Sequence, residues 1–447
     1  MRRVLIISPA FPPKNTPELQ RVRMSLPYYR ENGWEPIVLA VEPTAVEAPD
    51  EPALLATVPF DIAVHRCKAI SPHIGRRFGL GNLGWRAWLP LARAGARLIR
   101  EERIDLVFFS TTQFALLPLG RIWQALLGAP YVVDLQDPWR TDFYERPGAR
   151  RPPGGWKYQL ARAQAALLEP WSLRQLSGLI SVSAVYLQDL NRRYRWFKRI
   201  PTATIPFGAS ENDIATALTA NSMATGSLVP PARADNDSDR PLHLVYTGVA
   251  ITPEAVCVLF AALRAFREQA PAKAARFRFD FIGTNYAPPD RAQPSILPWA
   301  EKFGVADLVS ERPSRAGHLE CVRVQASADV LVLLGSSDRA YSASKLYPYF
   351  LAARPILALV FRESVMEKLL HDLGGARIAA FSEDETTEAH ETLLAYFSEL
   401  TERGAVLPTN RNEMYFNQHY LARTLTARQS QLFDRALTFS QTDATVI

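Results

Sequence analysis

GSSDRAYSASKLYPYFLAARPILALVF, residues 335–361, is the stretch that decides the fold. An apolar run from Ala328 to Leu334 precedes it and predicts a buried strand. A polar loop follows as far as Ser344, and we expect a helix from there until Pro355 prevents its continuation. Residues Ile356 to Phe361 predict a second buried strand. Strand, loop, helix and strand form the unit that builds a parallel α/β sheet.

The loop of this unit is the first candidate site, because ligands of parallel sheets bind beyond the carboxyl ends of the strands. We expect Ser344 or Ser342 to cap the helix. The first turn of a helix offers unpaired N–H groups and a partial positive charge, and Lys345 adds a full charge there. An anion is therefore the expected ligand. A capped helix with an exposed lysine explains the same residues without a function.

Two other motifs share these letters and are set aside. Ser342 to Lys345 matches the S-x-x-K of β-lactamase-like enzymes, but the accompanying S-D-N and K-T-G signals are missing. A lysine that binds pyridoxal phosphate needs a glycine and an arginine at set distances, and Pro348 and Phe350 stand nearby instead.

The length of 447 residues suits two α/β domains. The three cysteines, Cys67, Cys257 and Cys321, are far apart, which predicts a reducing, cytoplasmic location without disulfides and without zinc spacing. No apolar run reaches the roughly 18 residues of a membrane span. We therefore expect a cytoplasmic protein whose closest approach to a membrane is peripheral.

The charge is concentrated in the first half of the chain. Residues 1–200 hold 28 Lys and Arg against 17 Asp and Glu, a balance of +11. The remainder holds 23 against 28, a balance of −5, and the two recover the net charge of +6. A basic half favours an anionic partner, such as a membrane surface or a phosphorylated acceptor. No zinc-finger, RNP or basic-zipper pattern supports nucleic acid.

Strand and helix patterns alternate in two successive series. The first predicts strands at Val4–Ser8, Ile37–Val41, Ile62–Arg66, Ile104–Ser110, Tyr131–Leu135 and Leu179–Val182; the second at Leu242–Thr247, Phe277–Ile282, Val305–Val309, Ala328–Leu334, Ile356–Phe361 and Arg377–Phe381. We expect a first domain over residues 1–210, an interdomain segment over 211–240 and a second domain over 241–410. Residues 411–447 should form a helix that crosses back to the first domain. Each domain should be doubly wound and Rossmann-like.

Six segments in this order resemble the family 4 glycosyltransferases of the GT-B fold. They are VLIISPAFPPKNTPELQRVRMSLPYYRENGWEPIVLA from residue 4, YVVDLQDPWRTDFY from 131, IPFGASENDI from 205, LVYTGVAITPEAV from 244, FDFIGT from 279 and SASKLYPYFLAARPILALV from 342. The resemblance implies two Rossmann-like domains facing across a cleft. It implies transfer of a sugar from a nucleotide diphosphate donor to a carbohydrate or lipid-linked acceptor, in polysaccharide or glycolipid synthesis. The nucleotide sugar would be a substrate, and no cofactor is implied.

The resemblance also implies roles for individual residues. Thr247 and Gly248 would end the first strand of the donor domain beside the diphosphate. Ser342, Ser344 and Lys345 would bracket the phosphates or the sugar. Three residues of the first domain complete the set. Arg21 would enter the first helix facing the cleft, and Asp137 with Trp139 would lie near the acceptor or the domain interface.

The chain departs from the family pattern in its charged residues. The usual pair of glutamates, separated by seven residues, falls on Ala340 and Pro348, so Asp338 or Glu363 would have to contact the ribose. The usual basic pair after the donor-domain glycine is replaced by residues 250–253, AITP, and the stretch after Ser110 carries no histidine.

Lys345 and Arg21 are therefore expected to supply the positive charge at the phosphates, and Lys345, Arg21 and Asp137 are the catalytic candidates. No D-x-D metal motif is present, so no metal is expected. A protein of this shape that binds a nucleotide sugar without turnover is the alternative. A dinucleotide-dependent oxidoreductase ranks last, because no G-x-G-x-x-G follows a predicted strand.

Overall fold

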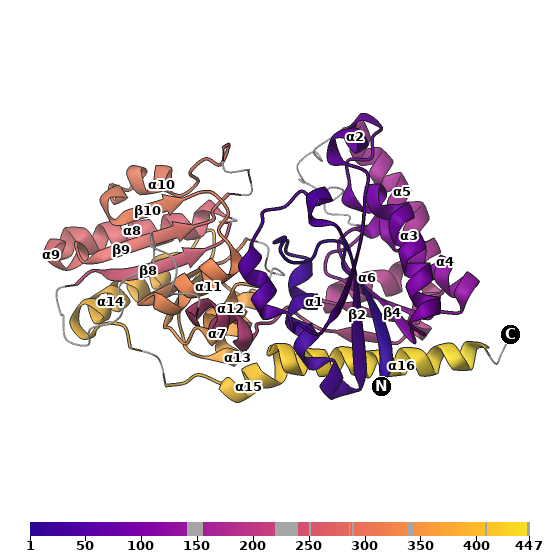
Figure 1. Ribbon diagram of the computed structural model, residues 1–447. Coiled ribbons are helices and arrows are strands. Elements are labelled where there is room, and N and C mark those ends of the chain that lie inside the picture. Colours follow the sequence, from indigo (N-terminus) through magenta and orange to yellow (C-terminus); the bar gives the residue numbers. More distant parts are fainter. Residues whose placement is uncertain are drawn as a thin grey trace. The chain divides into compact units, whose positions relative to one another are not determined.

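The protein divides into two compact units, and each is described by itself. The computed structural model describes residues 1–140, 155–219, 240–249, 252–285, 287, 290–337, 339, 343–406 and 409–444. The first unit comprises Met1–Phe207 together with Ala422–Ile447, and the second comprises Gly208–Leu421. Each unit holds one parallel sheet with helices between successive strands (Figure 1). The expected class, two doubly wound α/β domains, is confirmed.

The first unit contains a seven-stranded sheet in the order β3-β2-β1-β4-β5-β6-β7. Its strands are β1 (Arg2–Ile7), β2 (Trp34–Val41), β3 (Ala63–Cys67), β4 (Leu106–Ser110), β5 (Tyr131–Leu135), β6 (Gly178–Ser181) and β7 (Thr202–Thr204). Its helices are α1 (Leu19–Ser25), α2 (Pro72–Arg77), α3 (Leu83–Glu101), α4 (Pro118–Leu127), α5 (Trp156–Leu173), α6 (Ala184–Arg193) and α16 (Ala422–Ala444).

Alternation along β1 shows why this sheet is covered on both faces. Leu5 and Ile7 join a core cluster that includes residues of α3 and α4. Val4 and Ile6 join a second cluster that includes residues of α1 and α16. Successive side chains of a strand point to opposite faces, so an uninterrupted apolar run requires a helical layer on each side.

The C-terminal helix α16 supplies part of that second layer. Phe433 lies against three aromatic rings of the first unit, with centroid distances of 6.0 Å to Tyr29, 5.4 Å to Trp34 and 5.0 Å to Phe108. The Tyr29 hydroxyl donates a hydrogen bond of 3.0 Å to the side chain of Gln429. The last helix of the chain is therefore part of the core formed by its first strands.

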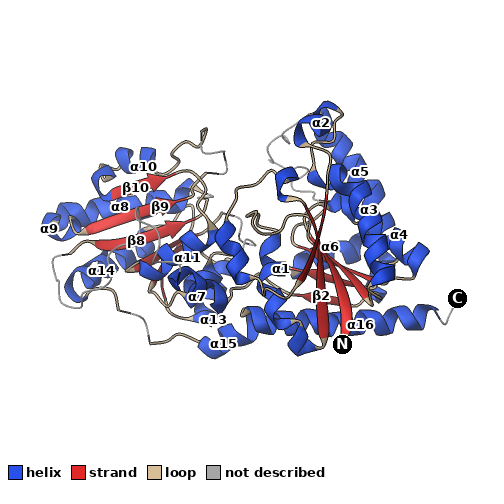
Figure 2. Cartoon of the chain, in the orientation of Figure 1, coloured by secondary structure: helices blue, strands red, loops and turns tan. Residues whose placement is uncertain are grey.

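The second unit contains a six-stranded parallel sheet in the order β10-β9-β8-β11-β12-β13 (Figure 2). Its strands are β8 (Leu242–Thr247), β9 (Phe277–Ile282), β10 (Val309–Arg312), β11 (Val330–Leu334), β12 (Ile356–Phe361) and β13 (Ala376–Phe381). Its helices are α7 (Glu211–Thr219), α8 (Pro253–Gln269), α9 (Pro271–Ala274), α10 (Leu297–Lys302), α11 (His318–Ser327), α12 (Leu346–Leu351), α13 (Val365–Leu373), α14 (Thr387–Arg403) and α15 (Glu413–His419).

Three expected elements differ in the structure. The segment expected as a linker begins with helix α7, where Asp213 bonds His318 of α11 at 2.7 Å; residues 220–239 of that segment lie outside the described residues. The long terminal helix is two helices, because the backbone of Leu421 pairs with Ala209 and separates α15 from α16. The strand expected at Val305–Val309 begins at Val309, after a short 3₁₀ turn.

Helix α3 continues through Pro90, although a proline inside a helix ordinarily interrupts it. Proline has no N–H to donate to the carbonyl four residues earlier, which belongs to Arg86. The Ile70 N–H donates to that carbonyl at 3.1 Å instead. A loop outside the helix thus supplies the hydrogen bond that the proline cannot make, and the interruption is avoided.

No helix among the described residues is long and apolar enough to cross a membrane.

Truncating Phe433 tests the role of α16. We expect Phe433→Ala to destabilise the first unit by about 3–5 kcal/mol, because a fully buried ring surrounded by aromatic neighbours leaves a cavity. Gln431→Ala is the matched control on the exposed side of the same helix and should leave the midpoint of thermal unfolding unchanged. Equal midpoints for both variants would contradict this role.

Candidate active site

Both sheets change the direction of their strand order at their first strand. β1 lies between β2 and β4, and β8 lies between β9 and β11. Ligands of doubly wound sheets bind at the carboxyl edge of such a point. A cluster of polar side chains occupies this edge in each unit. The two clusters are described separately, starting with the second unit.

Lys345 lies at the carboxyl edge of the second sheet, beside the end of β8. Its ammonium donates a hydrogen bond of 2.5 Å to the Tyr246 hydroxyl and lies 4.0 Å from the centre of that ring. A Cβ atom built on Gly248 would be 3.2 Å from the Lys345 Nζ. The φ angle of Gly248 is 106°, which disfavours other residues. The structure therefore brings together two of the expected site residues, Lys345 and Gly248.

The surroundings of Lys345 lower the pKa of its side-chain ammonium. Loss of hydration lowers the pKa of this ammonium from the ordinary 10.5 to about 7, opposed by the charge of Cys321. Near neutral pH, the charged and neutral forms are then similarly populated. A bound anion would favour the charged form, since an opposite charge nearby raises the pKa of an amine. The site is thus electrostatically suited to a negatively charged group.

Thr247, the last residue of β8, is held by buried side chains. The Thr247 N–H donates to the Tyr349 hydroxyl at 2.9 Å, and the Gln325 amide donates to the Thr247 hydroxyl at 2.8 Å. The Gly248 N–H donates to the Ile282 carbonyl at 2.8 Å. These bonds use the backbone donors of Thr247 and Gly248 internally. The backbone N–H groups at the end of β8, beside the Lys345 ammonium, are therefore already hydrogen-bonded within the protein.

The other expected residues of the second unit are not all brought to this point. Ser344 is exposed in the turn before α12, and no side-chain cap is seen at the start of that helix, where Lys345 is the N-cap residue. Glu363 lies beyond β12 and pairs with Arg339 at 2.9 Å, with 82% of its side chain exposed. Ser342 and Asp338 lie outside the described residues.

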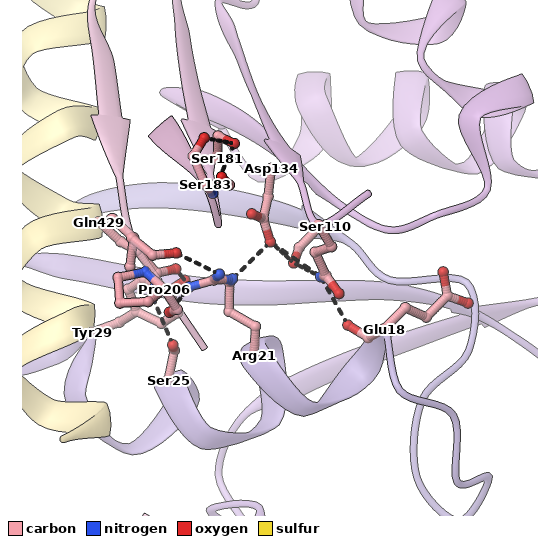
Figure 3. A network of polar contacts seen from close by, with 12 residues as sticks. Glu18, Arg21, Ser25, Tyr29, Ser110, Asp134, Ser181, Ser183, Pro206 and Gln429 are labelled. Atoms are coloured by element: carbon pink, nitrogen blue, oxygen red, sulfur yellow. Dashed lines mark hydrogen bonds and ion pairs between the residues drawn. The ribbon is translucent and has the colours of Figure 1, made fainter. Parts of the chain in front are cut away.

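In the first unit, Arg21 is buried in an ion pair (Figure 3). Its Nε lies 2.9 Å from Asp134 Oδ2, and Nη2 donates to the Ile205 carbonyl at 2.8 Å. Nη1 donates to the Pro206 carbonyl at 3.3 Å. The guanidinium thus ties helix α1 to the end of β5 and to the segment after β7. Its donors are directed into the protein, so Arg21 is not presented to a phosphate within this unit.

The Asp134 carboxylate is completely buried at the end of β5 and accepts further bonds. The Ser110 hydroxyl at the end of β4 donates to its Oδ2 at 2.9 Å, and the Gln136 amide donates to the same atom at 3.1 Å. Burial and the Asp134 charge raise the pKa of the Tyr29 hydroxyl, which therefore stays neutral. These bonds join the ends of β4 and β5, and the ion pair with Arg21 anchors helix α1 to them.

Glu18 connects this cluster to the loop after β4. Its carboxylate accepts hydrogen bonds from the Thr111 hydroxyl at 2.8 Å, the Thr112 N–H at 2.7 Å and the Thr112 hydroxyl at 2.9 Å. The Gln136 amide donates to the Glu18 carbonyl at 3.0 Å. The residue just before α1 thus fixes the loop in which the family pattern places a histidine.

Asp137 and Trp139 follow this cluster along the chain. Asp137 is exposed, yet partial desolvation raises the pKa of its carboxyl above the ordinary value. Trp139 is half-buried and stacks on Phe114, with ring centres 5.5 Å apart. Neither residue belongs to the Arg21 and Asp134 cluster. Both lie next to it, just past the carboxyl end of β5.

The sequence interpretation missed Glu18, Asp134, Ser110 and Gln136. A signal existed for Asp134, since it is a charged residue inside the apolar strand YVVDL, and a carboxylate placed there needs a partner. The pairing with Arg21 spans more than a hundred residues and has no local pattern. Among the described residues, no group of three or more His, Cys, Asp or Glu is arranged to hold a metal ion.

Comparison with known proteins agrees with this architecture. Residues 20–208, less than half of the chain, match the family model of the glycosyl transferase 4-like domain. A search of proteins of curated function finds no match. Three solved structures are similar over nearly the whole chain, at low sequence identity.

One similar structure is Anabaena HepE in complex with UDP and glucose, with 14% identity, coverage of 97% of this chain and 100% of that one, and a TM-score of 0.55. A second is the UDP-forming α,α-trehalose-phosphate synthase of Burkholderia vietnamiensis. It is 12% identical, the match covers 100% of both chains, and the TM-score is 0.51. A third, from E. coli, is described as trehalose-6-phosphate bound with UDP-2-fluoro glucose. It is 12% identical, the match covers 99% of this chain and 98% of that one, and the TM-score is 0.52.

The fold and the family match together define the class of this protein: it is a transferase enzyme with the GT-B fold. Residues 20–208 of this chain are similar to the glycosyl transferase 4-like domain, and the similarity to that family extends to this part of the chain.

Breaking the buried ion pair should be costly. We expect Arg21→Met or Asp134→Leu alone to destabilise the first unit by about 3–5 kcal/mol, since either leaves a buried charge without its partner. The double variant should lose clearly less than the sum of the two, as measured by urea unfolding. Additive losses would show that the two side chains do not depend on each other.

Lys345 should make stability depend on pH. Its pKa is lower in the folded protein than in the unfolded chain, so the folded state binds fewer protons between about 7 and 10.5. The destabilisation from this group is complete below pH 7 and disappears as the pH rises through that window. Unliganded Lys345→Met should gain stability relative to wild type at pH 6.5 but not at pH 10.5, by thermal unfolding. A difference that does not vary with pH would contradict the lowered pKa of this half-buried amine.

Proposed function

We propose that this enzyme transfers a sugar from a uridine diphosphate donor to a carbohydrate or lipid-linked acceptor, in polysaccharide or glycolipid synthesis. The observation that carries the proposal is the position of the Lys345 ammonium beside Gly248, at the carboxyl edge of the second sheet. A cation held at this edge is suited to a diphosphate. The nucleotide sugar acts as a substrate, and no cofactor is invoked.

The role proposed for Lys345 is charge stabilisation. When the bond between sugar and diphosphate breaks, negative charge grows on the departing oxygen, and a cation already in place stabilises it without reorganisation. The low pKa of the free amine favours this role, because donor binding would restore the proton where the charge is needed. We propose that Ser344, in the exposed turn before α12, and Ser342 add hydroxyl donors to the same group.

The uridine base is proposed because solved structures with a similar fold are described with UDP. The Anabaena protein is described in complex with UDP and glucose, and the Burkholderia enzyme is described as UDP-forming. For the ribose contact, Asp338 is the better of the two expected carboxylates, since Glu363 is already paired with Arg339. Thr247 is proposed to shape the wall of the site rather than to donate to the phosphates.

The acceptor is proposed to bind at the carboxyl edge of the first sheet. Asp137 is exposed there and carries a raised pKa, which suits a group that accepts hydrogen bonds from sugar hydroxyls or exchanges a proton. Trp139 offers half-buried apolar surface beside it. Arg21 is proposed as a positioning residue that keeps this edge in shape, in place of the phosphate role implied by the resemblance.

A cytoplasmic location with contact at a membrane surface is part of the proposal. No disulfide joins any of Cys67, Cys257 and Cys321, which all lie among the described residues, as suits a reducing compartment. The excess of positive charge in residues 1–200 favours an anionic surface.

A panel of nucleotide sugars tests the proposal. The protein is mixed with UDP-, GDP- and ADP-sugars, and thermal stabilisation and nucleotide release are measured. We expect UDP-sugars to stabilise the protein, by about 2.7 kcal/mol at a hundredfold excess over Kd. Affinity should fall as the pH rises from 6 to 9, since the neutral form of Lys345 binds an anion poorly.

Lys345→Met should lower the affinity for UDP-sugars at least tenfold, whereas Lys368→Met, a control on the exposed side of α13, should not. Stabilisation by no donor, or equal affinity of Lys345→Met and wild type, would overturn the site. Binding of a donor without any nucleotide release, with acceptors supplied, would support the alternative of a binding protein.

A further inference from the structure

We infer, on the basis of the proposed function, that Tyr246 is a positioning residue: its hydroxyl holds the Lys345 ammonium so that two N–H groups remain for the phosphates of the donor. Tyr246 is the second-last residue of β8 and is buried. Its ring belongs to the core of the second unit and lies 5.7 Å from the ring of Phe281. The core thus accounts for the ring, which a phenylalanine would supply equally well, but it does not account for the hydroxyl.

The hydroxyl of Tyr246 is oriented by a hydrogen bond to the segment that follows β8. It donates to the Val249 carbonyl at 2.7 Å, and a phenol carries only this one proton. Toward Lys345 the oxygen can therefore only accept, and the Lys345 Nζ donates to it at 2.5 Å. A buried tyrosine hydroxyl needs one partner, and the Val249 carbonyl already provides it. The contact with Lys345 is additional, and it directs one N–H of the lysine toward β8.

Gly248 confines the same ammonium from a second side. A Cβ atom built on Gly248 would be 3.2 Å from the Nζ and 3.4 Å from the Cε of Lys345. The centre of the Tyr246 ring lies 4.0 Å from the Nζ, so the cation also faces aromatic surface. An ammonium has three N–H donors, and Tyr246 takes one of them. Two donors remain, which is one for an oxygen of each phosphate in a diphosphate.

The other groups near Lys345 do not supply this hydrogen bond. Lost hydration lowers the pKa of Lys345, and the charge of Cys321 on α11 opposes that effect only in part. The Tyr349 hydroxyl of α12 is used by Thr247, whose N–H donates to it at 2.9 Å. In the part of the chain that the structure describes, Lys345 forms no ion pair with a carboxylate. The Tyr246 hydroxyl therefore favours the charged amine in the donor-free protein, because it accepts a hydrogen bond from that form.

Tyr246→Phe tests the inference, because it keeps the ring and removes the hydroxyl. In donor-free protein labelled with ¹³C at the lysine Cε, the titration of Lys345 is followed by NMR, and its signal is assigned with Lys345→Met. We expect a wild-type midpoint at about pH 7. In Tyr246→Phe the midpoint should fall by about one pH unit, since the charged amine loses its acceptor. An unchanged or raised midpoint overturns the inference.

The affinity for UDP-sugars should follow this titration. At pH 5.5, Tyr246→Phe should bind within about twofold of wild type, because the amine is charged in both proteins. At pH 8 it should bind about tenfold more weakly, because one pKa unit changes the ratio of charged to neutral amine tenfold. A variant that only disturbs the core would lose affinity by the same factor at every pH. That result also overturns the inference.

Tyr396→Phe is the matched control. It removes the hydroxyl of another buried tyrosine of the second unit, on α14, whose ring centre lies 5.2 Å from the guanidinium of Arg377 near the start of β13. It should keep the wild-type midpoint of Lys345 and the wild-type affinity at both pH values. Wild type that no nucleotide sugar stabilises would overturn the proposed function, whereas the donor-free titration decides separately whether Tyr246 holds Lys345.

Discussion

A carboxylate buried at the end of a strand must be neutralised, and in the first unit this requirement organises the whole carboxyl edge. Asp134 is completely inaccessible to solvent, and Arg21 reaches it from a different helix. The same guanidinium then holds the carbonyls of Ile205 and Pro206. One charge pair therefore determines the relative positions of α1, β5 and the segment that closes the unit. These contacts anchor the start of helix α1 and the segment after β7 to the carboxyl edge of the sheet.

In the second unit, the charged side chain at the carboxyl edge is Lys345, and it lacks the kind of counter-ion that Asp134 has in Arg21. Lys345 has no carboxylate partner among the described residues, and it lies against the ring and hydroxyl of Tyr246. Its pKa is lowered by lost hydration rather than raised by a counter-ion. A half-buried cation that lacks a counter-ion costs free energy, and a nearby negative charge would reduce that cost. The two units thus differ physically: one edge is internally satisfied, and the other is left short of negative charge.

Long-range hydrogen bonds also explain where local rules of helix formation did not hold. Pro90 does not end α3, because the Ile70 N–H replaces the donor that proline lacks. The terminal helix is divided because the backbone at Leu421 pairs with Ala209, two hundred residues earlier. In both cases a segment distant in sequence satisfies or captures a backbone group. The local sequence pattern around Pro90 or Leu421 does not indicate which distant backbone group will be its partner.

Much of the fold was predictable from the chain by itself, because buried parallel strands are continuous apolar runs and the alternation of strand and helix is local. The position of Lys345 at the carboxyl edge was predictable in the same way, because the residue follows a buried strand of a parallel sheet. The tertiary structure alone decided that Arg21 pairs with Asp134 and that Glu18 holds the loop at Thr111 and Thr112. Each of these depends on which distant groups meet in a desolvated place, and desolvation is a property of the folded protein rather than of any residue.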